Sequence, residues 1–178
     1  MTPEFVETRR DLIFWEYANI LSDSDLPDRE QLPLVTEKFK KFQEEINEWT
    51  YVLREGVDKN ATESSKCFYC NSSDDLILDK IVAERPCGYV ESHNLVKACK
   101  KCCASKGNKN LMEWWGWDRR YELPREVFAE YLKMLYICHQ CKGILDRKVR
   151  NINGELNLID LEAVFVASCE PPKRLEYR

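Results

Sequence analysis

Two Cys-x-x-Cys turns, formed by Cys67 with Cys70 and by Cys99 with Cys102, constrain the fold of this chain more than any other feature. Each turn presents two thiolates to one ion, and two turns together complete a tetrahedral zinc site. Because four thiolates leave no open coordination position, we expect this zinc to be structural rather than hydrolytic. Metal binding would link two distant segments, so metal affinity would contribute to folding. The alternative, four unrelated buried cysteines, is disfavoured by the paired spacing within a polar segment.

The chain holds nine cysteines, and an odd number argues against a framework in which every cysteine forms a disulfide. Residues 1–10 contain two glutamates and no apolar run, so we expect no signal peptide and a cytoplasmic, reducing environment. In such an environment, cysteines at this spacing are metal ligands more often than disulfide partners. A second metal site is an open alternative to buried free thiols. Its candidate ligands are Cys87, Cys138, Cys141, Cys169 and His139.

The pattern of apolar residues predicts a mainly helical chain. Of the 178 residues, 44% are hydrophobic, which is enough for the core of one domain. No apolar run has the roughly 20 residues that a membrane helix needs, so we expect no membrane partner. Apolar side chains recur at helical spacing over residues 4–21, 34–54 and 124–145. We expect a further short helix over residues 156–165.

A short, polar, cysteine-bearing segment separates these helices. Residues 76–82 predict a short strand pair or a strand followed by a loop, in which two apolar runs bracket Asp79 and Lys80. Residues 100–106 predict a helical turn or two, ended by Gly107. The predicted class is therefore α+β, a mainly helical domain around a small zinc-stapled core. The expected parts of this one compact domain are an N-terminal helical region (1–63), the core (64–117) and a C-terminal helical region (118–178).

Positive charge gathers in one stretch of a chain whose net charge is −4. Between Lys97 and Lys109 there are five lysines and no acidic residue, and a phosphate backbone responds to charge within about 10 Å. We therefore expect DNA as a partner, although a lysine-rich face that only contacts water is the alternative. The expected phosphate contacts are Lys97, Lys100, Lys101, Lys106 and Lys109. Candidates for further contacts are Arg119, Arg120 and Arg125. The tryptophans at 114, 115 and 117 would either stack on bases or cap the core.

The motifs around the cysteines are specific enough to compare with a known family. Residues 78–82 read Leu-Asp-Lys-Ile-Val, residues 92–98 read Ser-His-Asn-Leu-Val-Lys-Ala, and residues 103–107 read Cys-Ala-Ser-Lys-Gly. With the two Cys-x-x-Cys turns, this order resembles the HNH endonucleases of the zinc-knuckle type, which have a ββα-metal core. The resemblance extends to residues 10–21 and 123–133, which are similar to the flanking helices of one such family.

The resemblance implies a metal-dependent DNA endonuclease that hydrolyses phosphodiester bonds. In that family the position of Asp79 binds a catalytic divalent metal such as Mg²⁺, and the next position is a histidine that activates water as a general base. The position of Asn94 braces the loop that carries the base. The residue directly after the second Cys-x-x-Cys turn, here Cys103, is a further metal ligand.

Two positions depart from the family pattern, because Lys80 replaces the histidine base and Cys103 replaces an asparagine or histidine ligand. A lysine has an ordinary pKa of about 10.4, so Lys80 could act as a base only if burial beside a metal lowered its pKa. A protonated Lys80 would instead hold a phosphate or replace the charge of the metal. Cys103 would favour softer metals than Mg²⁺, or have a structural role. His93 is the candidate for a substitute base, and an exposed loop histidine is the alternative.

Two functions follow as the main hypotheses. The first is an HNH-type metal-dependent DNA endonuclease, active or degenerate at the base position. The alternative is a non-catalytic, zinc-dependent nucleic-acid-binding or regulatory module that has lost hydrolysis. A third hypothesis, a zinc-stapled adaptor for protein partners, would leave the lysine cluster without a role. The sequence leaves the oligomeric state open and is compatible with a homodimer.

Overall fold

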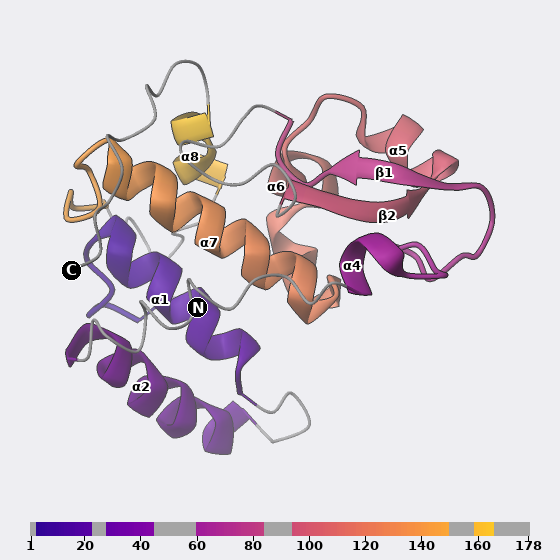
Figure 1. Cartoon of the computed structure of the whole chain (residues 1–178). Helices are drawn as coiled ribbons and strands as arrows, with labels where there is room; N and C mark the ends of the chain where they lie inside the picture. Colours follow the sequence, from indigo (N-terminus) through magenta and orange to yellow (C-terminus); the bar gives the residue numbers. More distant parts are fainter. Residues whose placement is uncertain (1–2, 23–27, 45–59, 84–93, 150–158, 166–178) are drawn as a thin grey trace, which may run out of the picture.

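The computed structural model describes residues 3–22, 28–44, 60–83, 94–149 and 159–165 of the chain. In chain order its elements are α1 (Arg9–Ile20), α2 (Asp28–Glu44), α4 (Asn60–Glu63), β1 (Leu76–Lys80), β2 (Leu95–Cys99), α5 (Lys100–Lys106), α6 (Leu111–Trp115), the 3-10 helix η2 (Trp117–Glu122), α7 (Arg125–Cys141), α8 (Ile159–Glu162) and the 3-10 helix η3 (Ala163–Phe165) (Figure 1). The described part is mostly helical and contains a two-stranded antiparallel sheet, which confirms the predicted α+β class.

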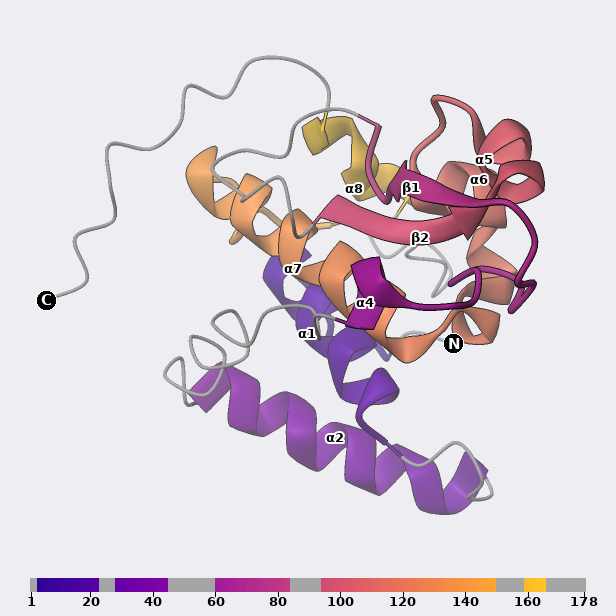
Figure 2. The same cartoon turned by 45° about the vertical axis from the view of Figure 1, so that its right-hand side comes forward.

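Helix α1 lies in the middle of the helical layer and packs against both α2 and α7 (Figures 1 and 2). The sequence predicts that this helix begins near residue 4, but it begins at Arg9 because Thr8 caps it. The backbone N–H of Asp11 donates to the Thr8 hydroxyl at 3.1 Å, and the Asp11 carboxylate accepts from the backbone N–H of Thr8 at 2.9 Å. This reciprocal pair satisfies N–H groups that the first helical turn leaves without partners.

The other long helices also differ in extent from the prediction. Helix α2 begins at Asp28, six residues before the predicted start at residue 34, so that Pro33 lies inside it. Residues 45–54 of that expected helix lie outside the described residues. Helix α7 follows Pro124, as predicted, but ends at Cys141 because the chain turns at Gly143, where φ is +63°. The helix expected over residues 156–165 is present as α8 and η3 over its described part.

Of the two arrangements predicted for residues 76–82, the structure shows a strand followed by a bend, and not a pairing of residues 76–78 with residues 81–82. Strand β1 instead pairs with β2, in a register that places Asp79 opposite Val96. Val96 and Ala98 on β2 are buried, and this buried face holds the strand against the core. Residues 81–83 form a bend beyond β1. Strand β2 leads directly into α5, so strand, strand and helix form one unit at the end of the molecule away from α2 (Figure 2).

One hydrophobic cluster contains residues of both the helical layer and this strand–strand–helix unit. Its members include Leu12 of α1, Phe39 of α2, Val96 of β2, Met112 of α6 and Tyr131 of α7. The short elements α4, α6 and η2, which the sequence pattern does not predict, connect the two parts, and α4 packs beside β2. Within the described ranges, no helix is both long and apolar enough to span a lipid bilayer.

Candidate functional site

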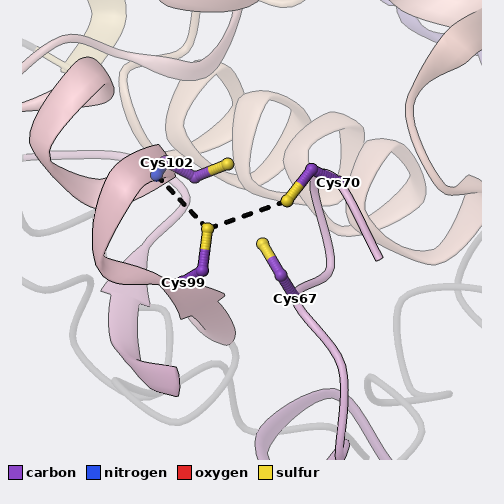
Figure 3. A group of neighbouring side chains, drawn as sticks. All are labelled: Cys67, Cys70, Cys99 and Cys102. Atoms are coloured by element: carbon purple, nitrogen blue, oxygen red, sulfur yellow. Dashed lines mark hydrogen bonds between the residues drawn. The ribbon is translucent and has the colours of Figure 1, made fainter. Parts of the chain in front are cut away.

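The four cysteines of the two Cys-x-x-Cys turns lie together. Cys67 and Cys70 belong to the turn before β1, Cys99 is the last residue of β2, and Cys102 lies in the first turn of α5. Their four Sγ atoms all lie within 4.8 Å of one another, and Figure 3 shows them pointing toward a common centre from two separate segments. The backbone N–H of Phe68 donates to the carbonyl of Lys97 at 2.9 Å, which joins the first turn to β2.

The spacing of the sulfur atoms fits a tetrahedral metal site. Four thiolates at a Zn–S distance of about 2.3 Å would lie about 3.8 Å apart, and the Sγ atoms of Cys70 and Cys99 are 3.7 Å apart. A disulfide would require about 2.05 Å, and all four cysteines are free thiols. The cluster could therefore hold a metal ion such as zinc, as the sequence predicts.

One thiol of the cluster, that of Cys99, has a lowered pKa. The backbone N–H of Cys102 donates to Cys99 Sγ at 3.5 Å, and this contact lowers the pKa of Cys99 to about 7. Burial raises the pKa of Cys102. A metal ion would reverse this second effect because a coordinated thiol is deprotonated.

The remaining cysteines give no second cluster within the described residues. Cys138 and Cys141 lie on α7 but join no group of metal-ligating side chains there. Cys87 and Cys169 lie outside the described residues. His139 is fully buried, and its ring Nδ1 lies 2.8 Å from the carbonyl of Leu135.

Asp79 lies on β1 beside the cysteine cluster and is held by two neighbours. The Tyr69 hydroxyl donates to Asp79 Oδ2 at 3.0 Å, and the ammonium of Lys106 lies 3.4 Å from the same oxygen. The Lys106 ammonium also donates to the carbonyl oxygen of Lys80 at 2.5 Å. Lys106 is 1% exposed and the side chain of Asp79 is 13% exposed, so this ion pair is largely screened from water.

The other groups around Asp79 are neutral near pH 7. Burial and the Asp79 carboxylate raise the pKa of Tyr69 well above its ordinary value. Burial, followed by the same carboxylate, raises the pKa of the Cys103 thiol. The side chain of Lys80 points to the opposite face of β1 and is exposed. The structure therefore brings Cys103 close to Asp79 but not the Lys80 ammonium.

Asn94 holds the chain that follows β1. Its side-chain oxygen accepts from the backbone N–H of Val82 at 2.8 Å, and its amide donates to the carbonyl of Val82 at 2.8 Å. Its own carbonyl accepts from the N–H of Ile81 at 2.9 Å. These three bonds fix the bend directly after Lys80. His93, the candidate for a substitute base, lies outside the described residues.

Four of the five expected phosphate contacts reach the surface, and one does not. Lys100, Lys101 and Lys109 are exposed, and Lys97 is half-buried. The Lys100 ammonium lies 3.5 Å from Asp75 Oδ2, and both side chains are open to water. Lys106 departs from the expectation, because its ammonium is buried against Asp79 and does not face solvent.

Trp114 and Arg120, which follow α5, pack within the protein, whereas Arg119 and Arg125 are exposed. Trp114 lies edge-on to Tyr69 with ring centroids 4.9 Å apart, and its indole N–H donates to the Ser105 hydroxyl at 3.1 Å. Arg120 stacks over Trp117 at 3.8 Å and binds the fully buried Glu16, with its Nε 3.0 Å from Glu16 Oε2. Arg120 thus joins η2 to α1, which is a structural contact rather than a free positive charge.

Sequence reasoning missed two partners of Asp79, Tyr69 and Lys106. Tyr69 could have been noticed because it lies between the first two cysteines, which fixes it next to the cysteine cluster. Lys106 looked like one more member of a solvent-facing lysine group. Only the packing of α5 against β1 distinguishes it from its neighbours.

Comparisons with protein-family models, with curated proteins and with solved structures found no match. Function is therefore inferred from the residues of the site and their geometry.

Proposed function

We propose that this chain is a zinc-stapled, HNH-like module that binds nucleic acid without hydrolysing it. The observation that carries the proposal is the exposure of Lys100 and Lys101 on α5, the helix whose start the four cysteines fix. Zinc in the cysteine cluster would hold β2 and α5 in one orientation. The lysines would then present a fixed set of charges to a phosphate backbone.

Electrostatics favours phosphate as the ligand of this surface. Lys100, Lys101 and Lys109 are exposed, and residues 97–109 contain no acidic residue. The contact of Lys100 with Asp75 is exposed and weak, so a phosphate can replace it. Helix α5 is too short to supply an N-terminal anion site, and the lysine side chains would provide the attraction.

The surroundings of Asp79 support binding without hydrolysis. A general base must be able to accept a proton near pH 7. Around Asp79, the described partners are an ammonium, a phenol and a thiol, and the pKa values of the last two are raised. The side chain of Lys80 is exposed on the opposite face of β1 from Asp79.

The binding proposal is tested by fluorescence anisotropy of a labelled DNA duplex over a range of salt concentrations. We expect binding at low salt that weakens as salt rises. In the Lys100→Gln/Lys101→Gln variant, the slope of log affinity against log salt should fall by about 0.9 for each phosphate that the variant no longer neutralises.

The matched control is Lys40→Gln/Lys41→Gln, which removes the same charge from two adjacent exposed lysines on α2. This variant should bind like the wild type. Absence of binding at low salt would contradict the proposal and favour the protein-adaptor hypothesis. An equal decrease of affinity in both variants would contradict the assignment of the binding surface to α5.

A second candidate function, a metal-dependent DNA endonuclease, is favoured by one observation. The Asn94 side chain braces the bend after β1 through both backbone groups of Val82, in the way that the family resemblance implies for an active loop. Cleavage would also need a base, for which His93 is the remaining candidate.

Incubation with supercoiled plasmid and Mg²⁺, Mn²⁺, Ni²⁺ or Zn²⁺ separates the two functions. Nicking by the wild type that disappears in Asp79→Ala would support the endonuclease and exclude the non-catalytic module. Nicking only by Lys80→His, or by Lys80→His/Cys103→Asn, would show a scaffold from which the catalytic groups have disappeared.

A further inference from the structure

We infer that the ammonium of Lys106 occupies the cation position at Asp79, so that the chain supplies its own cation there and excludes a divalent metal. The inference concerns the Asp79 site alone and holds whether or not the protein binds nucleic acid. It also accounts for the disagreement between this site and the catalytic metal that the family resemblance implies.

The oxygen atoms around the Lys106 ammonium are those that a hard divalent cation would use. One is the carboxylate oxygen Oδ2 of Asp79, at 3.4 Å, and the other is the backbone carbonyl oxygen of Lys80, at 2.5 Å. Carboxylate and carbonyl oxygens are the ligands that Mg²⁺, Mn²⁺ and Ca²⁺ bind in proteins. The ammonium therefore lies where such an ion would take the same two ligands.

Burial makes the two occupants mutually exclusive. Lys106 is 1% exposed, so its ammonium cannot move into water without rearrangement of α5. A buried ammonium is tolerated only with a negative partner, and Asp79 is that partner. A divalent ion on the same oxygen would lie beside a fixed positive charge, and the repulsion would be little screened.

Tyr69 and Cys103 reduce the capacity of the site for metal further. The Tyr69 hydroxyl already donates to Asp79 Oδ2 at 3.0 Å, which uses the oxygen that the ammonium also binds. Cys103 stands three residues before Lys106 on α5, so both side chains lie on the face of the helix toward β1. A thiol in that place is a poor ligand for a hard cation.

The four cysteines fix the position of this internal cation. Cys99 and Cys102 determine where α5 begins, and Lys106 is the last residue of the same short helix. A metal ion bound by the cysteines would therefore keep the lysine in register with Asp79. The two sites are linked by one helix, with a structural metal at its start and an ammonium in place of a metal at its end.

The inference is tested by titrating zinc-loaded protein with Mn²⁺ and following the electron paramagnetic resonance signal of free Mn²⁺, without nucleic acid. The wild type should show no Mn²⁺ binding that depends on Asp79 at millimolar Mn²⁺. Lys106→Ala should bind Mn²⁺ with a Kd at least about tenfold below the highest Mn²⁺ concentration at which the wild type shows no binding, because one positive charge has been removed beside the carboxylate. The double variant Asp79→Asn/Lys106→Ala should lose this binding.

Lys109→Ala is the matched control, since it removes an exposed lysine from the same part of the chain and should leave Mn²⁺ binding unchanged. Zinc content and circular dichroism check that each variant is folded. Wild-type Mn²⁺ binding that Asp79→Asn abolishes would overturn the inference, even if Lys106→Ala does not fold. A folded Lys106→Ala that binds no Mn²⁺ would overturn it as well. Loss of DNA binding in these variants would concern the proposed function only.

Discussion

The chemistry of the region around β1 depends on a few single side chains. The sequence indicates the role of some of them and not of others. The cysteine cluster was predictable because each pair is local, and a Cys-x-x-Cys turn places both thiols on one side of the chain. The contact between Asp79 and Lys106 was not predictable, because the two residues are far apart in sequence and meet only through packing. Spacing along the chain indicates the first kind of site, whereas the second requires the tertiary structure.

Asn94 is a residue whose loss should be costly wherever the function lies. In Asn94→Ala, the N–H and C=O of the buried Val82 would lose their hydrogen-bond partners. We expect the free energy of unfolding to fall by about 3 kcal/mol, since each buried unpaired polar group costs about 1–3 kcal/mol. Urea denaturation measures this change. The control Asn108→Ala replaces an exposed asparagine and should change stability by less than about 0.5 kcal/mol.

His139 should give the protein an acid-sensitive component of stability. Burial lowers the pKa of His139 to about 4, from an ordinary 6.5 in the unfolded chain. The unfolded state therefore binds the extra proton first, so the free energy of unfolding should decrease as pH falls from 6.5 to 4. The total decrease is about 3 kcal/mol, and above this window the contribution is complete and constant.

Urea denaturation at a series of pH values checks this, with His139→Leu as the comparison. Within the window, the free energy of unfolding should fall more steeply with decreasing pH for the wild type than for the variant. The difference in slope corresponds to the uptake of about one proton on unfolding. Acid loss of metal from the cysteine cluster is common to both proteins and cancels in the difference. Parallel pH profiles would show that His139 does not titrate in this way.

Individual elements were easier to locate than to delimit. The apolar spacing predicts the three long helices correctly, but their ends depend on particular contacts, such as the capping pair of Thr8 with Asp11. The partner of β1 was not predicted, because the apolar pattern of residues 76–82 fits either a strand pair or a strand followed by a loop. Residues 81–82 look like a strand in isolation, whereas β2 has the alternation of buried side chains that fits the core. Short elements such as η2 carry little periodicity and were not predicted.

The 3-10 helix η2 should depend on its attachment to α1 through Arg120 and Glu16. Glu16 is fully buried, and burial raises its pKa while Arg120 lowers it. Arg120→Ala would leave a buried carboxylate without a cation, so we expect the free energy of unfolding to fall by about 4 kcal/mol. Denaturation by urea, followed by tryptophan fluorescence, would report the change.

Two further variants show whether the ion pair is the cause. Glu16→Leu combined with Arg120→Ala should recover part of the missing stability, since the unpaired charge is gone. Arg119→Ala removes an exposed arginine that pairs with Glu122 and should cost less than about 1 kcal/mol. A similar loss for Arg119→Ala and Arg120→Ala would argue against a special role for the buried pair.

The molecule as a whole has one hydrophobic cluster that extends from the helical layer to the strand–strand–helix unit. The class α+β was predictable from the helical periodicity and the polar, cysteine-bearing centre. The way in which α4, α6 and η2 connect the two parts was not, because it depends on contacts between residues distant in sequence. Loss of the metal should consequently affect the entire core and not only the cysteine turns.

Removal of zinc should lower the thermal stability of the whole protein. A structural zinc contributes about 10 kcal/mol or more in small domains, and about 1 kcal/mol shifts the melting temperature of a chain of this size by about 2–4 °C. We expect chelation, or Cys70→Ser, to lower the melting temperature by more than about 10 °C in differential scanning calorimetry. Because protons compete for the thiolates, metal loss should become easier as pH falls.

Metal analysis should find close to one zinc per wild-type chain and much less in Cys70→Ser. Cys141→Ser, which alters a cysteine outside the cluster, should keep both its zinc and most of its melting temperature. Folded protein that contains no zinc and melts at the same temperature with and without chelator would contradict the metal site.

The direct passage from β2 into α5 has a consequence for how this arrangement can vary. No linker separates Cys99 from Lys100, so the position of the cysteine cluster directly fixes the position of α5. Each residue inserted between Cys102 and Lys106 would turn the lysine by about 100° around the helix axis and carry its charge away from Asp79. The number of residues between Cys102 and Lys106 is thus as informative about this internal cation as the identities of the two residues. Distant relatives with the same internal cation should preserve that interval even where the surrounding sequence has changed.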